Sequence, residues 1–219
     1  MNFDLTKEQI EFREKVRDFA EREVKPVASY NDEHEIFDVE LTKKMADLGL
    51  LGMCVPKEYG GQELDTLSYI IAVEELSRVD GSTAATIAAD NSLGISPIKE
   101  YGTKEQKEKY LPRLCKTHLW GFGLTEENAG CDSRGTQSTA RLEGNEWVVN
   151  GSKIFITNSA TPMTLGSTIQ VITGESNGKP EFTTFLIEND TPGFTQEAMD
   201  RKMMWRASNT GRLTFKNVE

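Results

Sequence analysis

The stretch Trp120-Gly-Phe-Gly-Leu-Thr-Glu-Glu-Asn-Ala-Gly-Cys-Asp132 separates two parts of the 219-residue sequence that differ in hydrophobic period. Before it, apolar residues recur every three or four positions, as in amphipathic helices. After it, apolar and polar residues alternate, as in strands with one buried face. Helices and strands that are segregated along a chain indicate an α+β fold rather than a doubly wound α/β one. We therefore predict an all-α helical bundle domain over residues 1–118, followed by a β-barrel domain over residues 119–219.

The helical part contains signals for the beginnings and ends of helices. Thr6 and Thr103 are each followed three residues later by glutamine, which forms a capping box that begins a helix. Pro26 and Pro112 are expected to end these two helices, and Gly49 is expected to end another as a left-handed cap. The helices between them are expected from apolar or small-residue spacing: Phe37 to Leu48, Asp65 to Val79 and Ser82 to Ser92.

Turn signals divide the second part of the sequence into strands. Gly144-Asn145 lies between two alternating runs and predicts a hairpin. Another strand is expected to end in Thr125. No expected strand is followed by a G-x-G-x-x-G motif, which disfavours a Rossmann dinucleotide site. The other expected strands are separated by clusters of Gly, Pro, Asn and Ser: Ile154 to Thr157, Ile169 to Ile172, Phe182 to Ile187 and Arg212 to Phe215.

Charge and composition exclude several classes of protein. The 25 Lys and Arg residues against 35 Asp and Glu residues give a net charge of −10. Affinity for nucleic acid and for anionic lipid comes mostly from Lys and Arg, so we expect neither partner. No run of 18 apolar residues is present, so we expect no membrane span. The three cysteines lie far apart, which indicates neither a disulfide framework nor a metal site.

Two segments are candidates for binding a ligand. In the first, a strand that ends in Thr125 and a loop that contains Gly130 would present a hydroxyl and backbone amides to a ligand that approaches the main chain. In the second, Phe155 and Thr157 share one face of a strand, which suits stacking and one hydrogen bond to a flat heteroaromatic cofactor. Each pattern also has an ordinary structural explanation. The first segment can be a strand followed by an Asn/Gly turn, and the second can be an aromatic–threonine pair packed on a neighbouring strand. The residues alone leave these alternatives open.

Six motifs occur in an order and spacing that are far more specific than any one of them. They are Val55-Pro-Lys-Glu-Tyr-Gly-Gly61, Tyr101-Gly-Thr-Lys-Glu-Gln106, Lys109-Tyr-Leu-Pro112, Gly123-Leu-Thr-Glu-Glu-Asn-Ala-Gly-Cys-Asp132, Asn150-Gly-Ser-Lys-Ile-Phe-Ile-Thr-Asn158 and Thr191-Pro-Gly-Phe194. On these motifs, essentially the whole sequence resembles the N-terminal and middle domains of the acyl-CoA dehydrogenase family. The resemblance implies an oxidoreductase that binds FAD and an acyl-CoA thioester. The residues that it places at the flavin are Phe122, Gly123, Leu124, Thr125, Gly130, Cys131, Phe155, Ile156 and Thr157.

The resemblance also implies a reaction and its partners. A base removes a proton beside the thioester while hydride passes from the next carbon to flavin N5, which gives an enoyl- or dienoyl-CoA, with a cyclic or unsaturated acyl group as one option. Electrons would pass to an electron-transfer flavoprotein, and the protein would be a homotetramer in the bacterial cytoplasm or the mitochondrial matrix. The alternatives are a non-catalytic acyl-CoA-binding or partner-binding member of the fold, and a flavin oxidase or monooxygenase on the same scaffold.

The sequence departs from the family pattern at two positions. Glu127 stands where the family usually has proline, and Cys131 stands where it usually has serine or threonine. A thiol is a poor hydrogen-bond donor, so a contact that the family hydroxyl makes to the thioester ligand and flavin would be weaker here. The helical domain that follows in the family, which usually supplies the glutamate base, is expected to be missing. We therefore expect a fragment that is weakly active or inactive by itself.

Asp90 is unusual because the segment that carries it lines the acyl pocket in relatives and usually has neutral side chains there. A carboxylate in that place is costly to bury unless it is paired or used. Asp90 is therefore a candidate general base, and a candidate for recognising a polar acyl tail, with Cys131 as the other candidate substrate contact. A third interpretation directs Asp90 to a helix N-terminus or to solvent.

Overall fold

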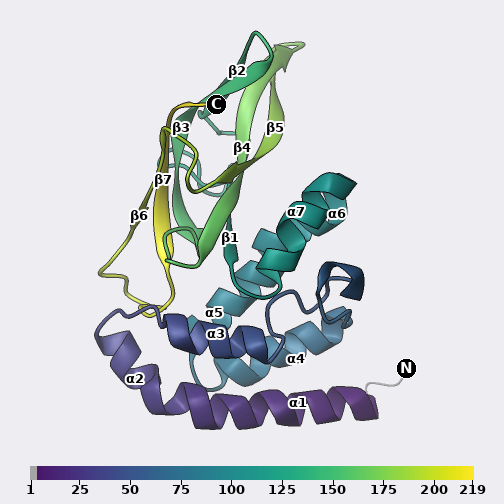
Figure 1. Ribbon diagram of the computed structural model, residues 1–219. Coiled ribbons are helices and arrows are strands. Elements are labelled where there is room, and N and C mark those ends of the chain that lie inside the picture. The colour runs from purple at the N-terminus through teal and green to yellow at the C-terminus, as the bar shows by residue number, and fades with distance from the viewer. Residues whose placement is uncertain (1–3) are drawn as a thin grey trace. The chain divides into compact units, whose positions relative to one another are not determined.

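The computed structural model describes residues 4–219 and divides the chain into two compact units. The first unit extends to His118 and also includes Asp200–Ser208, while the second comprises Leu119–Met199 and Asn209–Glu219. Figure 1 shows helices in the first unit and strands in the second. The predicted α+β class, with segregated helices and strands, is therefore confirmed. No helix within residues 4–219 is long and apolar enough to cross a membrane.

Local capping signals act in the first unit as the sequence predicts. Both capping boxes are present, at Thr6 and at Thr103. Gly49 has a φ of +85° just after the third helix, as the left-handed cap requires. The helices are α1 (Lys7–Phe19), α2 (Lys25–Glu33), α3 (Val39–Asp47), α4 (Thr66–Ser77), α5 (Gly81–Ala89), α6 (Ser96–Tyr101) and α7 (Lys104–Leu114), with the π-helical segments η1 (Ala20–Val24) and η3 (Asp90–Ile95) and the 3₁₀ turn η2 (Lys57–Tyr59).

The predicted helix ends at Pro26, Pro112 and Ser92 are wrong. Pro26 lies at the beginning of α2, and a π-helical turn carries the chain from α1 into it. The same device follows α5, because η3 leads into α6, which has a proline in its first turn. A proline lacks the N–H that an interior turn requires, and a widened turn before it lets the helical path continue. Pro112 lies inside α7, whose last turn is held by the fully buried Leu114.

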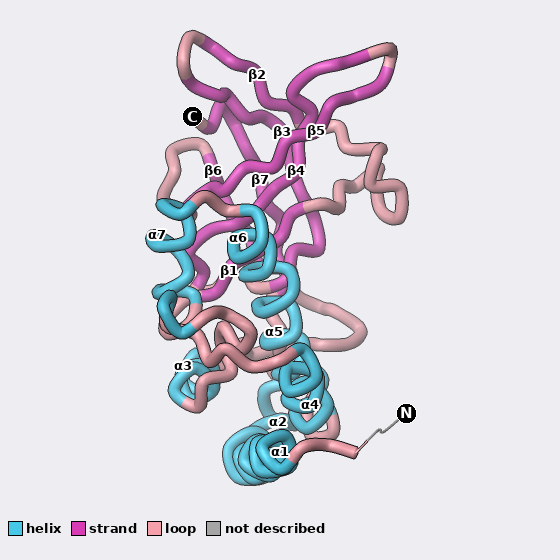
Figure 2. The backbone as a smooth tube through the Cα atoms, turned by 90° about the vertical axis from the view of Figure 1, so that its right-hand side faces the viewer, coloured by secondary structure: helices cyan, strands magenta, loops and turns pink. Residues whose placement is uncertain are grey.

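The second unit is one seven-stranded sheet with the order β1-β4-β2-β3-β7-β6, in which β5 pairs with β4. The sheet is curled into a half-barrel, which gives the predicted β-barrel domain its form (Figure 2). The predicted hairpin is confirmed, since β2 and β3 pair from Thr139↔Asn150 to Glu143↔Glu146. The strands are β1 (Leu119–Gly123), β2 (Thr139–Glu143), β3 (Glu146–Thr157), β4 (Thr164–Ser176), β5 (Lys179–Glu188), β6 (Phe194–Ala198) and β7 (Thr210–Val218).

Two features of the sheet differ from the sequence expectation. The first strand ends at Gly123 rather than at Thr125, so Thr125 lies in the loop that follows. Strand β6 was not expected, because only Phe194 among its residues is buried and no alternation marks it. The ring of Phe194 stacks on Phe215 of β7 at a centroid distance of 5.0 Å, within the core of the unit. Tertiary packing rather than local pattern therefore decides that this segment is a strand.

Candidate functional site

The glycines of β1 let this strand pack closely against side chains of its neighbours. A Cβ at Gly123 would lie 3.0 Å from Lys153 Cγ and 3.0 Å from Ile169 Cγ2, and a Cβ at Gly121 would lie 2.5 Å from Ser167 Oγ. A side chain at Gly121 would therefore displace Ser167, and one at Gly123 would press on Lys153 and Ile169. The close packing brings the end of β1 against β3, which carries the second candidate segment.

The loop after β1 begins with a set of backbone hydrogen bonds. The Thr125 carbonyl accepts a hydrogen bond from Ile154 N of β3 at 2.9 Å, and Glu126 and Ala129 exchange two more at 3.0 and 3.1 Å. Thr125 is half-buried, whereas Gly130 and Cys131 further along the loop are exposed. No atom of the described residues lies within 4 Å of a Cβ added at Gly130, so the space in front of this glycine is open. The backbone at Gly130 is therefore open to solvent.

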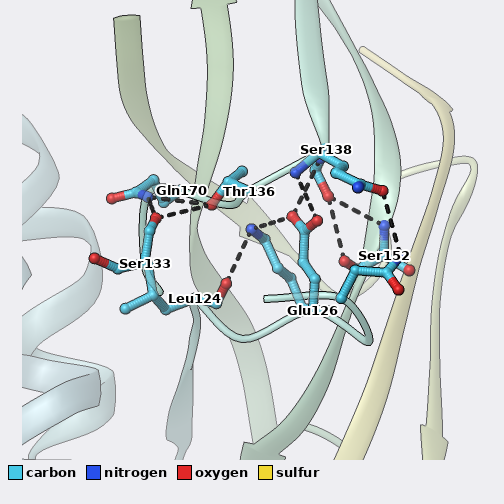
Figure 3. A network of polar contacts seen from close by, with 10 residues as sticks. Leu124, Glu126, Ser133, Thr136, Ser138, Ser152 and Gln170 are labelled. Carbon is cyan, nitrogen blue, oxygen red and sulfur yellow. Dashed lines mark hydrogen bonds and ion pairs between the residues drawn. The ribbon is translucent and has the colours of Figure 1, made fainter. Parts of the chain in front are cut away.

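A buried carboxylate joins the two ends of this loop (Figure 3). Glu126 Oε2 accepts a hydrogen bond from Gln137 N at 2.7 Å, and Glu126 Oε1 accepts one from Ser138 N at 3.1 Å. Lys153 Nζ of β3 donates to Glu126 Oε1 at 2.8 Å and to the Leu124 carbonyl at 3.3 Å. The Lys153 side chain is 0% exposed and that of Glu126 is 7% exposed. We call this ion pair, with its backbone partners, the loop clamp.

The electrostatics of the loop clamp favour an ionised carboxylate. Burial alone raises the pKa of the Glu126 carboxyl, but hydrogen bonds from Lys153 and the two backbone amides outweigh burial and lower this pKa below its ordinary value. Burial lowers the pKa of Lys153, and the nearby Glu126 carboxylate opposes that shift. Each member of the pair therefore offsets part of the desolvation cost of the other.

A second set of contacts holds the far part of the loop to the sheet. Gln170 Nε2 of β4 donates to the Ser133 carbonyl at 3.1 Å and to Thr136 Oγ1 at 3.3 Å (Figure 3). The Ser138 hydroxyl donates to the Ser152 carbonyl of β3 at 3.2 Å. Residues 127–134 thus form an exposed loop, apart from the buried Ala129, between anchored ends.

Phe155 has an unusual backbone and an unusual exposure. Its φ is +63°, within an irregularity in the β3–β7 register between Lys153 and Ile156. A left-handed backbone at an aromatic residue is uncommon and costs about 1–3 kcal/mol, and such strain clusters at functional sites. The Phe155 side chain is 61% exposed, while Ile156 beside it is 3% exposed and Thr157 is half-buried. The ring is therefore available to a ligand instead of packing in the core.

The two departures from the family pattern both lie on this loop. Glu127 forms an ion pair with Arg212 of β7, so a side chain that replaces the usual proline is used to tie the loop to the sheet. Cys131 is exposed. Within residues 4–219, no cluster of three or more His, Cys, Asp or Glu side chains could hold a metal ion.

Asp90 lies in the first unit, at the beginning of η3, and is 0% exposed. Its negative charge adds to burial in raising the pKa of the Cys115 thiol to about 12, so the carboxylate lies near this cysteine of the first unit. The interpretation that Asp90 points to solvent is therefore wrong. Its role as a base or as a contact to an acyl tail stays a prediction.

Sequence reasoning missed Glu126 and Lys153 as residues of the site. Both lie inside the motifs that carry the family resemblance, next to the predicted site residues Thr125 and Phe155. The available signal was a lysine directly before the apolar strand run Ile154–Ile156, because a charged residue in a buried strand needs a partner. Nothing in the sequence showed that the partner was an acid 27 positions earlier.

Two family models cover the chain almost completely. Residues 6–118 match the N-terminal domain of acyl-CoA dehydrogenases, and residues 121–218 match their middle domain. The chain belongs to the acyl-CoA dehydrogenase family. It spans 57% of the length of a curated relative, the short-chain-specific acyl-CoA dehydrogenase of Clostridium acetobutylicum, with which it is 48% identical over 219 residues, all of this chain.

Solved structures of members of this family have the same fold. The butyryl-CoA dehydrogenase of Megasphaera elsdenii matches with a TM-score of 0.92 and 40% identity, over 100% of this chain and 58% of that one. A glutaryl-CoA dehydrogenase of Mycobacterium smegmatis in complex with FADH2 matches with a TM-score of 0.91 and 33% identity, over 98% of this chain and 54% of that one.

Proposed function

We propose that this chain is the part of an FAD-dependent acyl-CoA dehydrogenase that holds the flavin against its acyl-CoA substrate. The observation that supports this most strongly is the exposed ring of Phe155, held out by a left-handed backbone beside Thr157. The neighbouring loop adds Thr125 and the open space at Gly130. A flat ring system can stack on the phenyl ring and accept hydrogen bonds from hydroxyls and backbone amides.

When bound, FAD supplies the acceptor for a hydride, and the protein supplies orientation and electrostatics. Thr125 and Thr157 would donate hydrogen bonds to polar atoms of the ring, and Phe155 would fix its plane. Preorganised donors of this kind stabilise negative charge that develops during a reaction. Phe122 and Leu124, which are half-buried, would form the apolar surroundings, and Gly123 would allow close packing beneath them. The side chain of Ile156 packs in the core of the sheet, so only its backbone could contact the ring. Asp90 and Cys131 stay candidates for contact with the acyl thioester.

The substrate class that the relatives favour is a short acyl chain. The names of the Clostridium and Megasphaera proteins carry the terms short-chain specific and butyryl-CoA. We therefore propose a saturated short-chain acyl-CoA as substrate and the corresponding enoyl-CoA as product. A cyclic or unsaturated acyl group, with a dienoyl-CoA product and Asp90 as base, is the less supported version of the same reaction. Electron transfer to a flavoprotein partner and assembly as a homotetramer are the remaining parts of the proposal.

The test uses the purified complete protein with its flavin under anaerobic conditions. We expect butyryl-CoA to bleach the visible absorbance of the oxidised flavin, and long-chain or cyclic acyl-CoA thioesters to do so more slowly. Slow reoxidation by oxygen is expected, because rapid peroxide formation is the behaviour of an oxidase. Absence of bleaching with every thioester would favour a non-catalytic binding protein, and absence of flavin binding would refute the proposal altogether.

A further inference from the structure

The loop clamp holds both sides of Thr125. On one side, Lys153 Nζ donates to the Leu124 carbonyl, and on the other it donates to the Glu126 carboxylate, at 3.3 and 2.8 Å. The Thr125 carbonyl between them accepts from Ile154 N. One strand, β3, thus fixes three successive residues of the loop, and the same strand carries Phe155 two residues after Lys153.

The carboxylate of the clamp also fixes where the loop returns to the sheet. Glu126 uses both of its oxygens to accept from Gln137 N and Ser138 N, immediately before β2 begins at Thr139. An amide in place of the carboxylate would turn one of these two acceptors into a donor that faces another donor. The two backbone amides therefore require a carboxylate at this position, because an amide side chain of the same size cannot accept both hydrogen bonds.

We propose that Glu126 and Lys153 are positioning residues, which set Thr125 and the exposed loop 127–134 relative to Phe155 and Thr157. The inference rests on the proposed flavin site and deepens it, because it identifies what holds the two halves of that site in register. A binding site needs its contact residues locked by a supporting shell, since a loosely held contact loses affinity. The same lysine would also tie the loop to the strand while no flavin is bound.

The competing interpretation is that the pair only stabilises the fold. A buried ion pair can often be replaced by apolar residues without loss of stability, so burial by itself does not assign a positioning role. The two interpretations differ in what a variant loses. Loss of a positioning contact loosens residues 127–138 and weakens flavin binding, whereas loss of a general stabilising contact affects the whole unit.

The first measurement is amide hydrogen exchange of the complete protein without flavin. In Glu126→Gln, which keeps the size of the side chain, we expect the Gln137 and Ser138 amides to exchange at least about tenfold faster, while the β4–β5 ladder keeps its protection. Lys153→Met combined with Glu126→Gln gives an uncharged version, in case a single substitution prevents folding. Arg212→Gln is the matched control, because it removes the exposed Glu127–Arg212 ion pair of the same loop and leaves Glu126 and Lys153 in place. We expect it to leave the exchange of the Gln137 and Ser138 amides unchanged.

The second measurement is the dissociation constant of FAD, with Val171→Ala of the core as a control that lowers stability without touching the loop. At metal sites, loss of a residue that supports a ligand costs about 10–100-fold in affinity. By analogy, we expect Glu126→Gln to weaken FAD binding by about tenfold and to shift the flavin visible spectrum. Val171→Ala is expected to leave both unchanged.

The possible outcomes separate this inference from the proposed function. Failure of the unmodified protein to bind FAD would refute the proposed function. The positioning role, but not the proposed function, would be overturned if Glu126→Gln kept the normal FAD affinity and spectrum. It would also be overturned if the Gln137 and Ser138 amides of this variant exchanged at unchanged rates. An equal effect of Val171→Ala would also overturn it.

Discussion

Replacement of Lys153 by methionine removes the ammonium group of the loop clamp and keeps most of its apolar stem. This group lies 2.8 Å from Glu126 Oε1, and the two side chains are 0% and 7% exposed. Removal of one member of a buried pair costs about 3–5 kcal/mol, because it leaves an uncompensated charge. Two backbone amides would still donate to Glu126, so we expect the free energy of unfolding to fall by about 3 kcal/mol at neutral pH.

The pH dependence gives this prediction a distinctive sign. In the unmodified protein the folded-state pKa of Glu126 is lowered from 4.5. The ionised carboxylate therefore contributes its full stabilisation at pH values above the pKa of the unfolded state, and this contribution is lost as the pH falls through the pKa of the folded state. Without the ammonium, only the hydrogen bonds from Gln137 and Ser138 oppose the effect of burial, so we expect the folded pKa of Glu126 to rise. Protonation then relieves the buried charge in the variant. The difference in stability between the two proteins is therefore expected to narrow between about pH 7 and pH 5.

Urea unfolding followed by circular dichroism at these two pH values measures the difference directly. Lys216→Met is the matched control, because Lys216 lies exposed on β7 and its replacement is expected to change stability by less than about 0.5 kcal/mol. A loss below about 1 kcal/mol for Lys153→Met at neutral pH would refute the estimate of a buried, unpaired carboxylate. A difference that stayed the same at both pH values would refute the assignment of that cost to Glu126.

Three further predictions follow from packing and exposure. Gly123→Ala places a methyl group 3.0 Å from Lys153 Cγ, and urea unfolding should show a loss of about 1–3 kcal/mol, whereas no measurable loss would mean that β1 can shift. Phe155 is 61% exposed, so Phe155→Ala should change the free energy of unfolding by less than about 0.5 kcal/mol and should weaken FAD binding. Leu142 on the β2–β3 hairpin is 58% exposed, and Leu142→Ala is the control that should change neither quantity. Burial raises the pKa of Cys115 to about 12, so iodoacetamide at mildly alkaline pH should modify this thiol only after unfolding. Peptide mass mapping separates it from the exposed Cys131, and rapid labelling of Cys115 in the native protein would contradict its burial.

Features that depend on neighbouring residues could be predicted from the sequence. The capping boxes at Thr6 and Thr103, the left-handed Gly49 and the hairpin around Gly144 each need only a few consecutive residues to form their hydrogen bonds. The change in hydrophobic period near Trp120 separates helices from strands for the same reason, because each period reflects the geometry of one local backbone conformation.

Features that depend on distant residues could not be predicted in this way. A proline rule assigned a helix end at Pro26, but a π-helical turn before it lets the helix continue. Strand β6 has no alternating pattern and is a strand because Phe194 stacks on Phe215 of β7. Neither the π-helical turn nor the stacking partner leaves a mark on the short window of sequence that a local rule reads.

The candidate site shows the same division. Residue order alone was enough to predict the family, the α+β fold class and the segments that contain Thr125 and Phe155. The pairing of Glu126 in the loop with Lys153 of β3, and the left-handed backbone of Phe155, depend on the folded structure. A buried charge requires a partner within hydrogen-bond distance, and the fold chooses which of the distant acids reaches it.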